Sequence, residues 1–271
     1  MGISRQAHYQ WQYRRAQEEV KSERVLELVR AKRLHQPRLG TRKLHHLIRP
    51  ALATQGLGIG RDALFALLRC AQLLVLPKRA YHKTTNSHHR FRRHPNLLKA
   101  GPEQVRAEAS EQVWVADITY LPTRERCAYL SLITDAYSRK IVGYHVHDSL
   151  HTAEVSQALK MALKGRRGCQ PLIHHSDRGI QYCAHEYQAI HQKHGLICSM
   201  TDGYDCYQNA LAERVNGILK QEFLLQPPDD LDQARRIVAQ SITIYNQERP
   251  HFSLQLKTPD EVHRASLQAS N

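Results

Sequence analysis

The fold is decided by the stretch Ser199-Met-Thr-Asp-Gly-Tyr-Asp-Cys-Tyr-Gln-Asn-Ala-Leu-Ala-Glu-Arg-Val-Asn-Gly-Ile-Leu-Lys-Gln-Glu-Phe223. From Gln208 onward it contains no Pro and one Gly, and its apolar residues recur at helical spacing, which predicts an amphipathic helix. At 100° per residue, one face collects Leu211, Val215, Ile218 and Leu219, and the opposite face collects Asn209, Glu213, Asn216, Gly217 and Lys220. We expect the first face to pack and the second to carry chemistry.

The polar face of this helix holds one carboxylate, Glu213, between amides and an ammonium group. Such a set suits a metal ligand beside a polyanion. An ordinary solvated helix face has the same composition, so the remainder of the chain has to decide between the two interpretations.

Positive charge is concentrated in the N-terminal part. The chain has 271 residues and a net charge of +14; residues 1–110 hold 22 Lys and Arg against 7 Asp and Glu, and residues 111–271 hold 17 against 18. This asymmetry predicts a basic nucleic-acid-binding region joined to a nearly neutral globular part. An anionic membrane surface or simple solubility are the alternatives.

Cysteine usage and hydropathy indicate an intracellular protein. The six cysteines form no Cys-x-x-Cys pair, which is typical of reduced thiols. The N-terminus is polar and basic, unlike a signal peptide, and the apolar stretch Leu64 to Leu76 is too short to span a bilayer. We therefore expect a soluble, cytoplasmic protein with no membrane partner.

Residues 1–76 are predicted to be a small helical DNA-binding region. Helices are expected over residues 3–17 with Ser4 as cap, 20–32, 41–48 with Thr41 as cap, and 61–68. The last two, joined by a Gly-containing turn, suggest a helix-turn-helix whose recognition helix opens at Arg61 and Asp62. Any small three-helix bundle has a similar pattern. The expected DNA contacts here are Arg42, Lys43 and Arg61.

Residues 77–112 are predicted to be a basic linker, because Pro77, Pro95 and Pro102 separate runs of Lys, Arg and His. Its expected phosphate contacts are Arg90, Arg92 and Arg93. A merely solvated tether is the alternative, and a zinc site at His88, His89 and His94 is disfavoured because no cysteine lies nearby.

From Val113 the pattern predicts an α/β domain. Strands are expected over 113–121, 128–134, 140–147, 171–174 and 196–200, and helices over 152–163, 185–194 and 231–247. Three antiparallel strands followed by alternating helices and strands make a mixed sheet. We assign residues 113–226 to a catalytic core and 227–271 to a C-terminal helical extension.

Two further acids are placed where a sheet would bring them toward Glu213. Asp117 lies inside the first strand on the side of Val113 and Val115, where a lone charge is costly unless paired. Asp177 follows the strand ending in His174-His175-Ser176, at the edge where α/β sheets place their sites. The separations of 60 and 36 residues prove little by themselves; the structural context of each acid carries the argument.

Several motifs accompany these acids along the chain. They are Trp114-Val-Ala-Asp117-Ile-Thr-Tyr120, Leu132-Ile-Thr-Asp135-Ala-Tyr-Ser-Arg-Lys-Ile-Val-Gly143, His175-Ser-Asp177-Arg-Gly179, Asp205, Asn209-Ala-Leu-Ala-Glu213, Tyr245-Asn-Gln-Glu-Arg-Pro-His251 and Thr258-Pro259. With them the chain closely resembles the DDE transposases of the retroviral-integrase superfamily. Among these it looks like the second-reading-frame (OrfB) product of the bacterial insertion-sequence family that makes its transposase by frameshifting.

The resemblance implies a ribonuclease-H-like catalytic domain with the acidic triad Asp117, Asp177 and Glu213. Asp135 is the competing acid, although its context at a strand end matches the family's structural turn. Mg²⁺ or Mn²⁺ prefers oxygen ligands, and two ions held by three carboxylates, with Asp117 bridging, can clamp both the attacking and the leaving oxygen of a phosphodiester. A water would cut the strand, and the freed 3′-hydroxyl would attack a second phosphodiester.

Near the cut, the expected DNA-backbone contacts are Arg178, Asn209, Asn216 and Lys220. His174 and His175 either orient a phosphate or pack inside the domain. The implied partners are insertion-sequence ends and target DNA, a second copy of the chain on paired ends, and a first-frame segment, because the chain has no sustained heptads and resembles the second frame alone. The alternatives are a DNA-binding regulator with an inactive nuclease-like domain and a nuclease that cleaves without joining.

Overall fold

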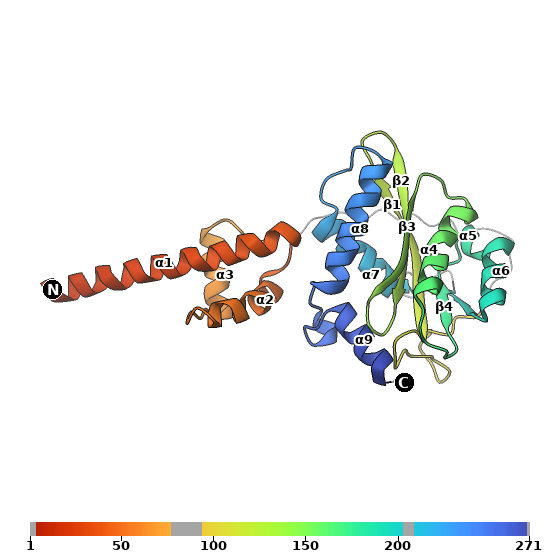
Figure 1. Cartoon of the computed structure of the whole chain (residues 1–271), viewed down its shortest axis with the longest axis horizontal. Coiled ribbons are helices and arrows are strands. Elements are labelled where there is room, and N and C mark those ends of the chain that lie inside the picture. The colour runs from red at the N-terminus through yellow and green to blue at the C-terminus, as the bar shows by residue number, and fades with distance from the viewer. Residues whose placement is uncertain (1–3, 77–93, 203–208, 270–271) are drawn as a thin grey trace. The chain divides into compact units, whose positions relative to one another are not determined.

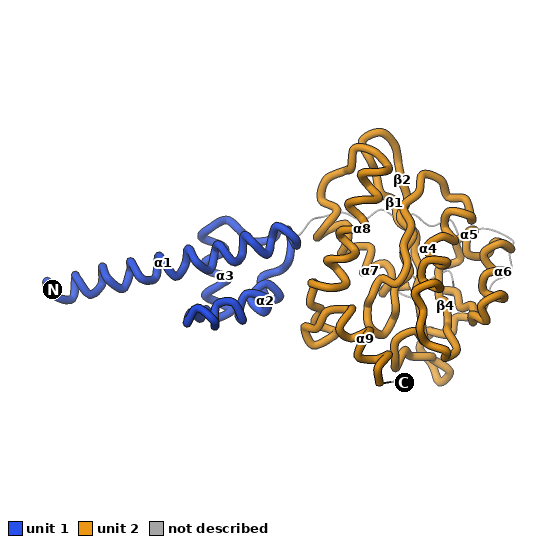
Figure 2. Tube along the Cα trace, in the orientation of Figure 1, with its two compact units in different colours: residues 1–79 blue, residues 80–271 orange. Residues whose placement is uncertain are grey.

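The computed structural model describes residues 4–76, 94–202 and 209–269 (Figure 1). The chain divides into two compact units, residues 1–79 and 80–271 (Figure 2). Arg90, Arg92 and Arg93, which we expect to contact DNA, lie outside the described residues. Each unit is considered by itself.

The first unit is a bundle of three helices, α1 (Arg5–His35), α2 (Thr41–Ala53) and α3 (Arg61–Cys70). Only the C-terminal part of α1 is packed, through Val25, Leu26 and Val29. These side chains meet a short apolar stripe on each of the other two helices, formed by Leu44, Ile48, Leu52, Leu64 and Leu68.

The N-terminal helices differ from the prediction in their limits. The two helices expected over 3–17 and 20–32 form one continuous helix, because no Pro or Gly interrupts the chain between Arg5 and His35. Ser4 caps it as expected, its Oγ accepting from the Ala7 N–H at 3.2 Å. At α2, the cap position is occupied by Gly40, and Thr41 is already the first helical residue.

The second unit is built on a five-stranded mixed sheet in the order β3-β2-β1-β4-β5. Its strands are β1 (Val113–Pro122), β2 (Cys127–Asp135), β3 (Ile141–His147), β4 (Ile173–Ser176) and β5 (Ile197–Met200). The first three are antiparallel, and β4 and β5 run parallel to β1. The strand expected over 171–174 lies two residues later, because pairing with β5 extends β4 to Ser176.

Helices cover both faces of this sheet (Figure 1). One face carries α4 (Thr152–Gly165), α5 (Ile180–Cys183) and α6 (His185–His194); the other carries α7 (Ala210–Ile218), its π-helical continuation η2 (Leu219–Phe223) and α8 (Leu231–Gln247). After a short 3₁₀ turn η3 (Phe252–Leu254), α9 (Pro259–Ala269) packs on α8. The expected α/β fold with a mixed sheet is confirmed.

Two apolar cores follow from the alternation of side chains along the strands. Trp114, Ala116 and Ile133 point toward α4 to α6, where they meet Leu159 and Tyr187, and Met200 of β5 belongs to the same core. Leu130 and Leu132 point toward α7 and α8, where they meet Val215, Val238 and Tyr245. A three-layer arrangement results, with the sheet in the middle.

Residues 94–112 belong to the second unit and are not part of a free linker. The Met200 N–H donates to the Pro95 carbonyl at 3.2 Å, and the Leu97 N–H donates to Ser199 Oγ at 3.0 Å. Glu111, which is 3% exposed, accepts from the Arg167 and Gly168 N–H groups. Pro95 and Pro102, two of the prolines predicted to lie in a linker, therefore belong to an ordered segment that is hydrogen-bonded to β5, and Pro77 lies outside the described residues.

Within the described part of the chain, every helix is too short or too polar to cross a membrane.

Candidate active site

Asp117 lies in the middle of β1, opposite Leu132 of β2. Because side chains alternate along a strand, it points to the sheet face that α7 covers, while its neighbour Ala116 belongs to the other core. Asn216 of α7 donates from Nδ2 to Asp117 Oδ2 at 2.7 Å. This hydrogen bond fixes the carboxylate against the helix that carries Glu213.

Asp177 follows directly after β4, the strand parallel to β1. Its Oδ1 accepts from the Gly179 N–H at 2.9 Å. A Cβ placed on Gly179 would lie 3.0 Å from that same oxygen. Glycine thus lets the backbone come close enough to hold the carboxylate at the sheet edge.

Glu213 lies in the first turn of α7. The helix is fastened to β1 at both its ends: Asn209 Nδ2 donates to the Ala116 carbonyl at 3.0 Å, and Asn216 donates to Asp117. Both amides are buried, each 5% exposed. The polar face of α7 therefore faces the sheet, and Glu213 comes near the two aspartates.

The electrostatics of Asp117 record this convergence. Burial raises its pKa to about 7, with further contributions from the negative charges of Asp177 and Glu213 and an opposing one from the Asn216 hydrogen bond. The pKa of the Lys220 ammonium group is lowered by burial, and the charge of Asp117 counteracts this effect. Three carboxylates and one cation thus share a single electrostatic neighbourhood.

Tyr182 is a neighbour of the site that sequence reasoning missed. Its ring is 2% exposed, and burial raises its pKa well above the ordinary value, with additional contributions from Asp177 and Asp117. It lies in the four-residue helix α5, which is too short to produce a periodic pattern. The one hint in the sequence was that Tyr182 follows Asp177 closely along the chain.

Asp135 does not belong to this group of acids. It is fully buried and accepts hydrogen bonds from the Glu111 N–H at 2.7 Å, the Ser138 N–H at 2.8 Å and Ser138 Oγ at 2.7 Å. His263 of α9 lies against the same network. Asp135 therefore organises the turn after β2, in agreement with its context in the sequence.

The two histidines before Asp177 are also structural. Both are fully buried; His175 Nδ1 pairs with Ser199 Oγ at 2.8 Å, and His174 Nε2 lies 3.3 Å from Tyr187 Oη. Their rings lie within the protein interior. Of the two roles considered for them, packing fits this environment.

The described residues that we expect to contact DNA lie in both units, and each unit is taken in turn. Arg42 and Arg61 are exposed at the first turns of α2 and α3, with Lys43 partly buried beside them; Arg61 also pairs with Asp62 at 2.8 Å. Arg178 lies 3.9 Å from Asp202, which also pairs with Lys99 at 2.8 Å.

The other expected contacts of the second unit are Asn209 and Asn216 of α7 and Lys220 of η2. Both asparagines are buried, and each amide donates to β1, so the structure gives them a role in holding α7 against this strand. Lys220 keeps a partly exposed side chain beside the acids.

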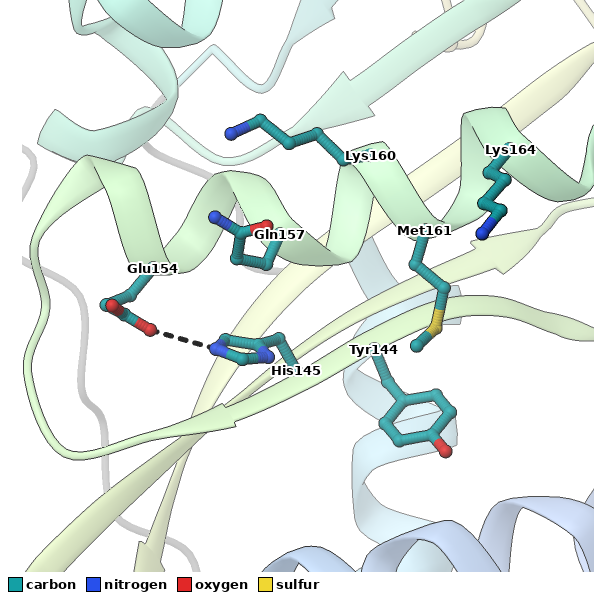
Figure 3. A pocket seen from close by; sticks show the side chains of 7 residues that line it. All are labelled: Tyr144, His145, Glu154, Gln157, Lys160, Met161 and Lys164. Carbon is teal, nitrogen blue, oxygen red and sulfur yellow. Dashed lines mark hydrogen bonds and ion pairs between the residues drawn. The ribbon is translucent and has the colours of Figure 1, made fainter.

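A hollow of about 560 Å³ lies elsewhere, between β3 and α4. Figure 3 shows Tyr144 and His145 on the strand, opposite Glu154 and Met161 on the helix, with a hydrogen bond of 2.9 Å joining His145 Nε2 and Glu154 Oε2. None of the three converging acids lines it, so it is separate from the candidate active site.

The chain is similar to known proteins along most of its length. Residues 107–206 and 194–259 each match an integrase core domain family. An uncharacterized 31 kDa protein of insertion element IS600 from Shigella sonnei is 38% identical over 257 residues, which cover 93% of this chain and 92% of that protein. The chain belongs to the insertion-sequence transposases with an integrase core domain.

Further relatives of the transposase are consistent with this membership. The transposase InsF of insertion sequence IS3fB from Escherichia coli is 34% identical over 171 residues, covering 63% of this chain and 58% of that protein. The simian T-cell lymphotropic virus intasome, solved in complex with PP2A regulatory subunit B56 gamma, matches with a TM-score of 0.51 and 19% identity, covering 83% of this chain and 74% of that one. The protein is a DNA transposase, a polynucleotidyl transferase with the ribonuclease-H-like fold that the resemblance implies.

Proposed function

We propose that Asp117, Asp177 and Glu213 are the catalytic carboxylates of this transposase and hold two Mg²⁺ or Mn²⁺ ions for cleavage and strand transfer of element DNA. One observation carries this assignment: the charges of Asp177 and Glu213 both act on Asp117 and contribute to the rise of its pKa to about 7. This mutual influence supports a common site for three acids that are 60 and 36 residues apart in sequence.

The donor set fits a hard divalent cation in type and in charge. Three carboxylates supply only oxygen ligands, and their mutual repulsion favours a site that a cation neutralises. Among the described residues no three His, Cys, Asp or Glu side chains already form a metal-ligand cluster. The three acids therefore fit a divalent cation by the type of their ligand atoms and by their mutual electrostatic influence.

Residues of the chain prepare this site in distinct ways. Asn216 holds Asp117 Oδ2, and the Gly179 N–H holds Asp177 Oδ1, which reduces the rotation of both carboxylates. Lys220 supplies positive charge next to Asp117, where a phosphate of the DNA would lie. When bound, the cations would activate water or a 3′-hydroxyl and stabilise the leaving oxygen.

DNA binding by the first unit is part of the same proposal. Arg42 and Arg61 are exposed at the starts of α2 and α3, in the region with the positive excess. A homo-oligomer on paired element ends and a first-frame partner also remain proposals. The affinity for element-end duplexes should fall steeply between 50 and 200 mM salt, as it does for proteins that neutralise several phosphates. An affinity that barely changes with salt would contradict a role for this region.

A strand-transfer assay tests the catalytic assignment. Labelled element-end DNA is incubated with Mn²⁺ or Mg²⁺ and the chain, beside Glu213→Gln and the matched exposed control Glu186→Gln. We expect cation-dependent joined products from the wild type and the control, and none from Glu213→Gln. Cleavage without joining would favour a nuclease, and binding without chemistry in all three would favour a regulator.

A further inference from the structure

A buried ion pair joins the end of α8 to the helix that carries Glu213. Arg249 donates from Nε to Glu222 Oε2 at 2.8 Å and from Nη2 to Glu222 Oε1 at 2.7 Å. The side chains are 3% and 21% exposed for Arg249 and Glu222. This parallel two-bond geometry fixes both the distance and the relative orientation of the two groups.

The Arg249 guanidinium also contacts His251 and Tyr245. Arg249 Nη1 lies 3.0 Å from His251 Nε2, and the guanidinium carbon lies 5.8 Å from the ring centre of Tyr245. Tyr245 in turn donates from its hydroxyl to the Arg139 carbonyl at 3.1 Å, next to the start of β3. Tyr245 thus ties the motif Tyr245-Asn-Gln-Glu-Arg-Pro-His251, which contains Arg249, to the residues that precede β3.

Glu222 is attached to Glu213 through continuous helix. It lies in η2, which follows α7 without a break and has a π-type turn closed by the Leu224 N–H and the Leu219 carbonyl at 2.8 Å. Each π turn holds one residue more than an α turn, so it changes which side chains face the core, and such turns are frequent at functional sites. Here the turn places Leu219 in the core and Glu222 on Arg249.

Stability alone does not account for this arrangement. An ion pair removed from water is often no more stabilising than apolar side chains of similar size. α7 has only nine residues, and its polar links to β1, through Asn209 and Asn216, lie on one side. The Glu222–Arg249 pair links η2 to the segment after α8. This second link restricts the rotation of α7 more than apolar packing alone would.

We infer that the Glu222–Arg249 pair is a positioning device that sets the rotation of α7 and η2, so that Glu213 faces Asp117 and Asp177. This inference rests on the proposed role of the three acids. Neither Glu222 nor Arg249 touches the reacting atoms; they act through the helix, and their loss should weaken cation binding together with catalysis.

The test uses the double variant Glu222→Met with Arg249→Met, which replaces the pair by apolar side chains of similar length. Arg249→Lys, which keeps the charge and loses the paired geometry, serves if the double variant fails to fold. Val238→Ala, a core change on α8 that leaves the Glu222–Arg249 pair in place, is the control for destabilisation. The melting temperature is measured against Mn²⁺ concentration without DNA, because a cation that binds the folded state raises it.

We expect the double variant to melt near the wild-type temperature, to need about tenfold more Mn²⁺ for its half-maximal stabilisation, and to lose about 10- to 100-fold in strand transfer. Val238→Ala should melt lower with an unchanged Mn²⁺ midpoint. A wild-type midpoint and activity in both pair variants would overturn the inference alone. A Mn²⁺ response that survives in Glu213→Gln would overturn the proposed function, and the inference with it.

Discussion

The two faces of the sheet are packed by different means. Toward α4 the backbones approach very closely: a Cβ on Gly143 of β3 would lie 2.2 Å from the Ala158 carbonyl oxygen and 2.9 Å from the Ala162 Cβ. One polar link, from His145 to Glu154, accompanies this contact. Toward α7 and α8, an apolar core is combined with directional polar links, from Asn209, Asn216, Asn246 and Arg249.

The difference teaches how the site is held. Close apolar packing fixes the separation of two elements but tolerates some rotation, whereas hydrogen bonds with defined donors and acceptors fix orientation. The acid-bearing helix lies on the face that uses the second means. The α4 face supplies the rigid backing for the sheet, and the α7 face sets the direction of the carboxylates.

The largest expected effect comes from Asp117→Asn on the α7 face. Strand transfer should fall at least about 10³-fold, or about 4 kcal/mol in the activation barrier, because a carboxylate proposed to hold both cations is lost. Stability should change in the opposite direction. Without divalent cations at pH 8, the free energy of unfolding should rise by about 1 to 2 kcal/mol, because a buried charge beside two like charges is removed.

Urea unfolding in a chelator, paired with the strand-transfer assay, measures both quantities. Asp135→Asn is the matched control on an acid outside the site; its carboxylate accepts three hydrogen bonds, so this change should lower stability. A loss of stability in Asp117→Asn would contradict the convergence of charge on that residue.

The next effect tests the α4 face. Gly143→Ala should lower the free energy of unfolding by about 3 kcal/mol, because the new methyl group collides with the backbone of α4. Gly217→Ala is the matched change on α7, where no atom lies within 4 Å of the added Cβ. It should raise stability by about 0.5 to 1 kcal/mol through helix propensity. Equal effects at the two glycines would refute the contrast between the faces.

The smallest effects concern pH, to which the two faces should respond in opposite senses. The folded-state pKa of Asp117 is raised from 3.8 to about 7, so the folded state binds more protons there and its contribution to stability is lost as pH rises from about 4 to 7. On the α6 side, burial lowers the pKa of His191 from 6.5 to about 4, so stability is lost as pH falls through that interval.

Differences between the wild type and single variants isolate each group. Replacing Asp117 by Asn should remove most of its contribution to the loss of stability as the pH rises from about 4 to 7. Replacing His191 by Phe should remove most of its contribution to the loss as the pH falls from 6.5 to about 4. Unfolding free energies from pH 4 to 8 in a chelator provide the data. Slopes of the same sign for both residues would contradict the assignment of either environment.

Much of the fold could be predicted because its signals are local. The runs of β-branched and aromatic residues give β1 to β3 within two residues, and the helix over 231–247 agrees with α8 at both ends. α5 was not predicted, because its four residues are too few to show a helical periodicity of apolar residues. α9 was assigned only as part of a helical extension, although Thr258 and Glu261 form a capping box that marks its start.

The acids of the proposed site have sequence signals, and the residues that support them do not. Asp117 stands out within β1 and Asp177 directly after β4, but the direction of Asn209 and Asn216 depends on how α7 is rotated against β1. That rotation is decided by long-range contacts, including the pair of Glu222 with Arg249, and no periodicity within a single segment reveals them.

The place of Arg249 in the chain has a consequence for synthesis. Glu222 finds its partner only 27 residues further along, after the whole of α8. Chains fold from the N-terminus as they are made, so the sheet with Asp117 and Asp177 can form while α8 is still being synthesised. If Glu213 has the proposed role, its alignment is completed only late in translation, once Arg249 has been added to the chain.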